Sequence, residues 1–158
     1  METLQETQLK KMDVNTHLFD EEVYLKEITE FGLSWQELLT GQLKPPVQGA
    51  RFNVAFEGRI DGPYLSGIKK GVDFLLVRAD GQFIIDLQAV ITTPEGDTIS
   101  VHEEGLLIPD KDSPTGQLKL TMRFNTASPG YSWLNEIQAW ATGKVDMLNG
   151  TVRVSAFK

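Results

Sequence analysis

Hydrophobic and polar residues alternate with a period of two along most of the chain after residue 50. The clearest case is the segment 52–60, in which Phe52, Val54, Phe56 and Ile60 are separated by mostly polar residues. Side chains of a β-strand point alternately to opposite faces, so this pattern predicts a half-buried strand.

The same alternation recurs between short turn signals such as Asp61-Gly62-Pro63, Asp80-Gly81 and Asn149-Gly150. We therefore expect eight or nine strands, at 22–31, 52–60, 64–68, 72–79, 82–93, 98–108, 118–124, 138–142 and 151–157. Short strands joined by short turns are typical of an antiparallel barrel or a sandwich. An all-β fold is the prediction, with a closed or nearly closed antiparallel β-barrel as its form.

One short helix is expected near the N-terminus. Ser34 and Glu37 have the spacing of a capping box, two leucines follow, and Gly41 is a plausible stop. Residues 1–20 are polar with little apolar periodicity, and they read as an N-terminal arm without fixed structure. Residues 21–158 are expected to form a single barrel domain.

Two turns allow three of the predicted strands to be aligned. If Asp80-Gly81 forms a two-residue loop and residues 94–97 form a four-residue loop, the register of both hairpins follows. Asp73, Gln88 and Glu103 then form a row across one face of the sheet. We expect an error of one residue to change these pairings but not the face on which each side chain lies.

This face also carries Asp86 and is otherwise apolar. Polar groups on an apolar inner face are typical of a ligand-binding barrel, and neighbouring carboxylates raise one another's pKa. The alternative is a solvent-exposed face, with Phe83, Ile85 and Leu87 on the opposite face forming the only core. Because both faces are apolar, the second could pack on the helix, on the arm or on another subunit, and the last of these alternatives would give a homodimer.

Composition narrows the class of protein. The chain has 158 residues, no cysteine and a formal net charge of −7. Disulfides and thiolate metal sites are therefore excluded, and binding to nucleic acid or to anionic membranes is disfavoured. No apolar run is long enough to span a membrane and the N-terminus does not resemble a signal peptide, so we expect a cytoplasmic protein.

Several motifs resemble the small proteins of the family called domain of unknown function 3237. They are Gly62–Gly67, Asp73–Gly81 followed by Asp86, Phe124–Thr126 and Tyr131–Asn135. The match runs from about Gly49 to the end. It implies a barrel of calycin-like or allene-oxide-cyclase-like shape and no defined activity, and it places two family aspartates at Asp73 and Asp86. The chain departs from the family pattern at Phe74, Gln88 and Asn125.

Asp86 is the best candidate for proton transfer, assisted by Asp73 and Glu103. An aspartate near a turn can instead accept backbone hydrogen bonds, which is the structural alternative for Asp73. Trp133 could stack on a ligand or plug the barrel end, and Arg51 could bind an anion or form a surface salt bridge. The remaining candidate ligand-binding residues are Gln88, Tyr64 and Asn125.

The sequence predicts no metal and no cofactor. His17 and His102 are the only histidines, and no phosphate-binding loop or nucleophile elbow is present. A barrel that binds a small organic molecule is the first hypothesis. A cofactor-independent lyase or isomerase using Asp86 is an alternative, as is an interaction module with a filled core, so whether the protein is an enzyme stays open.

Overall fold

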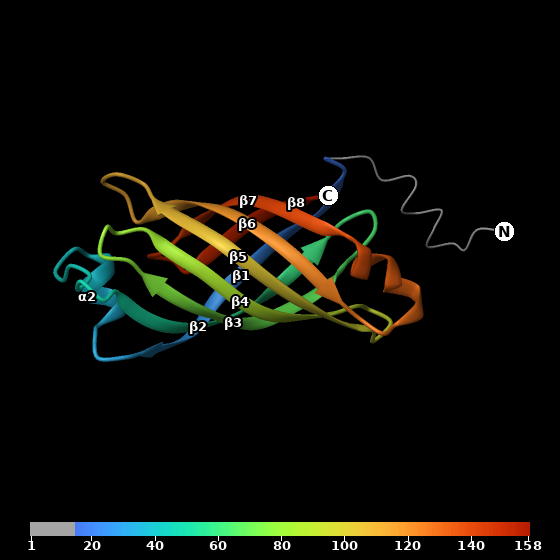
Figure 1. Cartoon of the computed structure of the whole chain (residues 1–158), viewed down its shortest axis with the longest axis horizontal. Helices are drawn as coiled ribbons and strands as arrows, with labels where there is room; N and C mark the ends of the chain where they lie inside the picture. Colours follow the sequence, from blue (N-terminus) through green and yellow to red (C-terminus); the bar gives the residue numbers. More distant parts are fainter. Residues whose placement is uncertain (1–14) are drawn as a thin grey trace.

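Eight antiparallel strands, joined in sequence order, close into a barrel in the computed structural model, which describes residues 15–158 (Figure 1). Each strand pairs with its neighbours along the chain, and β1 closes the barrel by pairing with β8. The strands are β1 His17–Glu30, β2 Ala50–Asp61, β3 Gly67–Val77, β4 Phe83–Thr92, β5 Thr98–Pro109, β6 Thr115–Asn125, β7 Gln138–Asp146 and β8 Thr151–Phe157. The closed antiparallel barrel expected from the alternation is confirmed.

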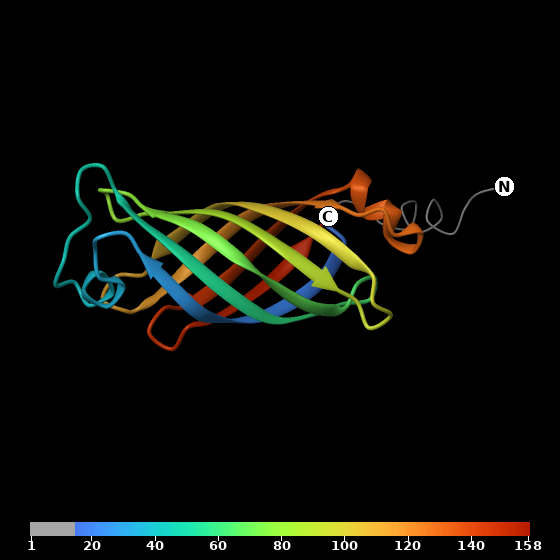
Figure 2. The same cartoon turned by 90° about the horizontal axis from the view of Figure 1, so that it is seen from below.

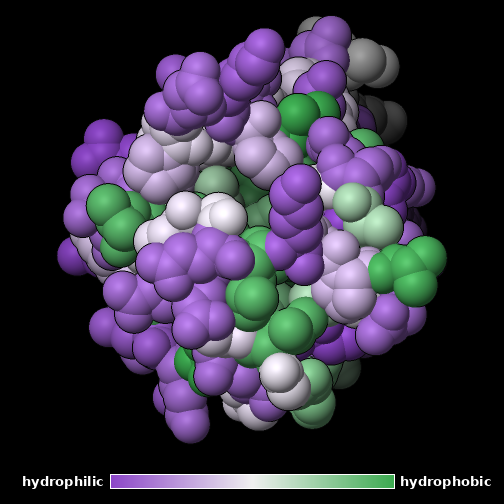
Figure 3. All heavy atoms as spheres, turned by 90° about the vertical axis from the view of Figure 1, so that its left-hand side faces the viewer, coloured by the Kyte–Doolittle hydropathy of each residue, from purple (hydrophilic) through white to green (hydrophobic). Residues whose placement is uncertain are grey.

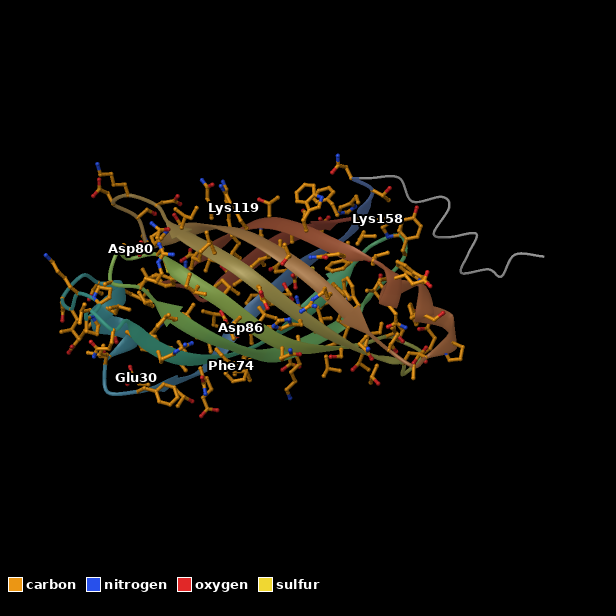
Figure 4. All side chains as sticks on the ribbon, in the orientation of Figure 1. Glu30, Phe74, Asp80, Asp86, Lys119 and Lys158 are labelled. Atoms are coloured by element: carbon orange, nitrogen blue, oxygen red, sulfur yellow. The ribbon has the colours of Figure 1, made fainter. Side chains whose placement is uncertain are left out.

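Two short helices lie at opposite ends of the barrel. The α-helix α2, Trp35–Leu39, connects β1 to β2, and the 3-10 helix η1, Pro129–Glu136, connects β6 to β7 (Figures 1 and 2). Glu30 and Asp80 lie at the α2 end, whereas Lys158 lies at the other (Figure 4). No helix within residues 15–158 is long and apolar enough to cross a membrane.

The helix α2 forms where the capping box predicts it. The Ser34 hydroxyl oxygen accepts a hydrogen bond from the Glu37 backbone N–H at 3.2 Å. Gly41 follows in a left-handed conformation, φ 78°, which glycine adopts without steric cost. No residue of α2 is fully buried.

The core fills the barrel because alternate residues of every strand point inward. Its most completely buried side chains include Phe52, Ile91, Ile99, Val101 and Met122. Four of them, Ile91, Ile99, Val101 and Met122, lie in the half of the barrel near η1. The other half contains the cavity described below.

Several predicted boundaries are corrected. The segments predicted as two strands, 64–68 and 72–79, form the single strand β3, so the barrel has eight strands. The first strand already begins at His17, inside the predicted arm, and the rest of that arm, residues 1–14, lies outside the described residues.

The register expected for both hairpins is wrong by one residue, for the same reason in each. Gly81 donates its N–H to Arg78 O, and Gly96 donates its N–H to Thr93 O. Both glycines have positive φ, 87° and 92°, so each closes a three-residue loop rather than a two- or four-residue one.

Because of these two shifts, the side chains of β4 lie on the faces opposite to those expected, whereas the side chains of β3 and β5 lie on the expected faces. Thr92 pairs with Thr98 and Leu76 with Ile84, so Asp86 lies on the outer face. The expectation that facing is independent of register is therefore wrong, because register decides which residues of adjacent strands share a face. Phe83, Ile85 and Leu87 lie in the core, which removes the apolar outer face on which the homodimer prediction rested.

Candidate functional site

A cavity of about 80 Å³ lies inside the barrel, in the half near α2. Its walls are mainly Val, Leu, Ile and Phe side chains, and its polar lining comes from four charged residues. The wall residues are Val23, Leu25, Val54, Phe56, Leu75, Phe83, Ile85, Leu87, Leu107, Leu118, Leu120, Val145, Met147, Val152 and Val154, with Trp35 from α2. The charged residues are Glu21, Lys69, Asp73 and Glu103.

Lys69 stands between two buried glutamates. Its ammonium nitrogen lies 3.0 Å and 2.8 Å from the two carboxylate oxygens of Glu21, and it also forms an ion pair with Glu103 Oε2. The side chains come from β1, β3 and β5, and their exposed fractions are 3%, 2% and 0%. The apolar walls thus surround an almost fully dehydrated group of charges.

Glu103 has an oxygen without a partner. Among the described residues, no group forms a hydrogen bond with Glu103 Oε1, although the side chain is completely buried. A buried polar atom normally has a hydrogen-bond partner, and leaving it without one costs about 1–3 kcal/mol. Glu103 also lines the cavity, so a molecule bound there would lie against this side chain.

Burial changes the acidity of this group. Burial is the main reason that the pKa of Glu103 is raised to about 7; the Lys69 ammonium opposes this rise, and the charge of Glu21 contributes to it. Burial alone would lower the pKa of Lys69, but the two glutamates outweigh it and the pKa is raised. Glu103 therefore gains or loses a proton near neutral pH.

Asp73 belongs to β3, lines the cavity and contacts the neighbouring strand β4. Its Oδ1 accepts a hydrogen bond from the Asp86 backbone N–H at 3.1 Å. Burial raises the pKa of Asp73 to about 7, and this hydrogen bond opposes the shift. The cavity therefore contains two carboxyl groups that titrate near neutral pH, which suits proton transfer.

The two ends of the barrel are closed by aromatic residues. The Trp35 ring packs edge-on against Phe52 and Phe83, with centroid distances of 5.0 Å and 6.3 Å. At this end the space-filling view shows hydrophobic side chains in a recess bordered by hydrophilic ones (Figure 3). At the η1 end, Trp133 is buried and packs edge-on against Tyr64 at 6.3 Å. Trp133 and Tyr64 therefore plug the barrel and do not line the cavity.

Four of the predicted site residues lie outside the barrel. Asp86, Gln88, Arg51 and Asn125 are exposed on the outer face, so the structure corrects the placement of Asp86 and Gln88 in an internal polar row. Figure 4 shows Asp86 midway along the barrel. The cavity brings together only Asp73 and Glu103 of the predicted set.

Sequence reasoning missed Lys69 and Glu21. Lys69, Asp73, Leu75 and Val77 share one face of β3, and this pattern becomes visible only if the strand is continued through Gly71. Glu21 is the first residue of the predicted barrel domain and precedes the predicted first strand, although it lies within β1. Continuing the alternation into charged residues would have found both.

Two family-like motifs have structural roles. Asn135 accepts the Thr126 N–H at 2.8 Å and donates to Thr126 O at 2.9 Å, which fixes η1 to the end of β6. Arg78 Nε donates to Asp80 Oδ1 at 3.0 Å, and the same oxygen accepts the Gln82 N–H, which holds the β3–β4 loop. These motifs therefore account for fold rather than chemistry.

One group on the outer face has the donor atoms of a metal site. Asp86 Oδ1 and Glu104 Oε1 lie 2.9 Å and 3.5 Å from His102 Nε2, and the three donor atoms lie within 4.8 Å of one another. Arg123 Nη2 is 3.4 Å from the other ring nitrogen of His102. A cation on the opposite side of the ring opposes metal binding, and the contacts already present pair His102 with Asp86.

Solved structures share the barrel. A beta-barrel like protein from Acinetobacter baumannii is 25% identical, with a TM-score of 0.70 over 92% of this chain and 94% of its own. A protein of unknown function from Clostridium acetobutylicum is 19% identical, with a TM-score of 0.74 over 92% and 97%. An enzyme from Penicillium herquei is 21% identical, with a TM-score of 0.58 over 92% and 96%. At these identities the last two establish the fold alone.

No curated protein matches the sequence. A family model described as "Protein of unknown function (DUF3237)" matches residues 40–158, from the end of α2 to the last residue of the chain. This span covers β2 to β8 and so includes Lys69, Asp73 and Glu103. The chain belongs to the DUF3237 family of proteins of unknown function.

Proposed function

We propose that the protein binds a small organic molecule in the barrel cavity, with the apolar part of the molecule against the walls and a polar group against Glu103. The observation that carries this proposal is Glu103 Oε1, which is fully buried and lacks a hydrogen-bond partner in the described chain, on a side chain that lines the cavity. Ligand pockets are commonly apolar with a few convergent polar groups, which matches this lining.

The size of the cavity limits the ligand. A cavity of roughly 150 Å³ with apolar walls can hold benzene, and the space here, about 80 Å³, is roughly half of that. A ligand of a few heavy atoms fits as the barrel stands. A larger one requires Trp35 to move, and α2 offers little resistance because none of its residues is fully buried.

Native mass spectrometry tests the proposal on protein purified gently from its own host. We expect an added mass that Glu103→Gln loses, because the amide replaces the carboxyl group that the ligand contacts. Glu104→Gln is the matched control, since Glu104 is the next residue along β5 and faces solvent. A protein mass without ligand, or a ligand that Glu103→Gln retains, contradicts the proposal.

A second candidate function is proton transfer on the bound molecule, as in a cofactor-independent lyase or isomerase. It is favoured by two cavity carboxyl groups, Asp73 and Glu103, each with a pKa raised to about 7 by burial. One could remove a proton while the other delivers one, because each is about half protonated at neutral pH. In this version Glu103 and Asp73 take the role that the sequence assigned to Asp86.

Hydrogen exchange distinguishes the enzyme from a simple binder. The co-purified molecule is incubated with the protein in heavy water and its carbon-bound deuterium is measured by mass spectrometry. Proton transfer predicts deuterium incorporation that Glu103→Gln and Asp73→Asn both reduce by a factor of at least 100, the usual contribution of a general acid or base. If the molecule binds but incorporates no deuterium, the result contradicts the proton-transfer function and agrees with binding alone.

A further inference from the structure

The cavity contains more negative than positive groups. Glu21, Asp73 and Glu103 contribute three carboxyl groups, whereas Lys69 is the only cation among the described residues that line the cavity. Lys69 forms ion pairs with both Glu21 and Glu103, so one positive charge is shared by two glutamates and Asp73 adds a third carboxyl group. Every other side chain that lines the cavity, from β1 to β8 and α2, is uncharged.

We infer that the cavity selects a small primary amine in its ammonium form, with the ammonium group donating to Glu103 Oε1 and facing Asp73 and the alkyl part lying against the aliphatic walls. This inference rests on the proposed function and names the chemical class of its ligand. A buried carboxylate oxygen without a partner, such as Glu103 Oε1, is stabilised most by a charge-assisted hydrogen bond from a cation.

Other polar groups complement the cavity less well. A carboxylate ligand would add a fourth negative group beside Glu21, Glu103 and Asp73, and like charges repel strongly in a medium of low dielectric constant. An alcohol could accept a hydrogen bond from protonated Glu103, but it would leave Asp73 and Glu103 without a counter-charge once both ionise. Of these three groups, only the ammonium group offers both a donor and a positive charge.

The experiment compares three probes of similar size, n-propylamine, 1-propanol and propionate, by NMR titration of the full chain at pH 6 and pH 8. Alkylamines remain protonated at both values. We expect propylammonium to shift the signals of cavity residues such as Leu87 and Leu120, with an affinity at least tenfold higher than that of propanol. Its affinity should rise from pH 6 to pH 8, because Asp73 and Glu103 lose their protons in this interval.

Substitutions of the cavity carboxyl groups test which side chains bind propylammonium. Glu103→Gln should weaken propylammonium binding at least tenfold, the order expected for loss of a hydrogen bond to a charged group. Asp73→Asn provides a second test if Glu103→Gln does not fold, and it should reduce the pH dependence. Glu104→Gln is the control and should bind propylammonium as the unmodified protein does.

The possible failures are distinct. If propanol or propionate binds in the cavity as tightly as propylammonium, the ammonium inference is overturned and the proposed binding function stands. Shifts confined to outer acids such as Asp86 and Glu104 also overturn the inference, because they indicate adventitious attraction to an acidic surface. If no probe shifts any cavity signal, both the inference and the proposed function fail.

Discussion

The Asp73 carboxylate, which lines the cavity, accepts a hydrogen bond from the backbone N–H of Asp86, whose own side chain lies on the outer face of the barrel. The two aspartates expected to share one site are thus joined through the barrel wall. The backbone N–H of Asp86 donates to Asp73, whereas the Asp86 side chain lies on the outer face, with Oδ1 2.9 Å from His102 Nε2. Of the two, only Asp73 can contact a molecule inside the barrel.

The protein should lose stability as the pH rises from about 4 to about 7. The pKa of Asp73 is raised from 3.8 to about 7 in the folded state, so the folded protein holds a proton that the unfolded chain has released. Stability then falls with rising pH, by at most about 1.4 kcal/mol per pH unit for each such group, and levels off above pH 7. Glu103 contributes in the same direction.

Asp73→Asn checks this expectation by urea unfolding between pH 4.5 and 8.5. The asparagine oxygen can still accept the Asp86 N–H, but it does not titrate. The variant should therefore show a shallower decline and exceed the parent protein in stability at pH 8. Asp110→Asn, on an exposed loop residue, should reproduce the parent curve. Equal slopes for Asp73→Asn and the parent would contradict a buried, titrating Asp73.

Much of the fold can be predicted from the local alternation of hydrophobic and polar residues, whereas the residues that line the cavity cannot. Alternation places the β2, β3 and β5 side chains correctly because each strand is long and its apolar positions are regular. The facing of β4 depends on the loops at its two ends, where Gly81 and Gly96 adopt left-handed conformations in three-residue turns. A glycine in a turn signals that the chain reverses but not how many residues the loop contains, so one residue at each end decided the position of Asp86.

The buried charges are also hard to predict, for a physical reason. Lys69 and Glu21 are separated by 48 residues, and each alone violates the expectation that charged side chains face water. β1 and β3 flank β2 in the sheet, and the inner faces of these two strands carry the two charges, which compensate each other. The pair is therefore a property of the assembled sheet and not of either strand.

Removing Lys69 should destabilise the protein strongly. Lys69→Met leaves Glu21 and Glu103 buried without a cation, and loss of one partner from a buried ion pair costs about 3–5 kcal/mol. Lys70→Met, at the next and exposed position of β3, should change the free energy of unfolding by less than about 0.5 kcal/mol. Urea unfolding of both variants measures the difference, and similar costs would contradict the burial of Lys69.

Replacing Glu21, Lys69 and Glu103 together by apolar residues should not destabilise the protein, in contrast to replacing Lys69 alone. Glu21→Leu, Lys69→Met and Glu103→Leu combined remove every charge of the group, and well-packed apolar replacements of buried ion pairs are often neutral or stabilising by about 1–4 kcal/mol. The triple variant should unfold at an equal or higher urea concentration than the parent while losing any cavity ligand. A stability as low as that of Lys69→Met would indicate that the charges are needed for folding and not for binding.

Trp35→Ala should enlarge the cavity at its α2 end. The indole ring packs on Phe52 and Phe83 and forms part of the lining, so its removal opens the space of about 80 Å³ toward solvent. We expect this variant to bind benzene, detected by NMR shifts of the methyl groups in the walls, whereas the parent binds it weakly or not at all. Trp140→Ala, which removes a tryptophan stacked on Phe157 at the outer surface, is the control. Benzene binding equal in the parent and Trp35→Ala would show that Trp35 does not limit the cavity.

The facing of β4 can be tested directly because the chain contains no cysteine. Single cysteines are introduced at Asp86, Leu87, Gln88 and Ala89, and their reaction with a maleimide is timed in the native state. Asp86→Cys and Gln88→Cys should react quickly because these positions face solvent, whereas Leu87→Cys and Ala89→Cys should react only when the protein opens, and so at least 100-fold more slowly. The two-residue loop expected from Asp80-Gly81 predicts the reverse order. Labelling in urea controls for intrinsic thiol reactivity, because all four cysteines should react alike there. Fast labelling of Leu87→Cys in the native state would indicate that Leu87 faces solvent and that Asp86 points into the barrel.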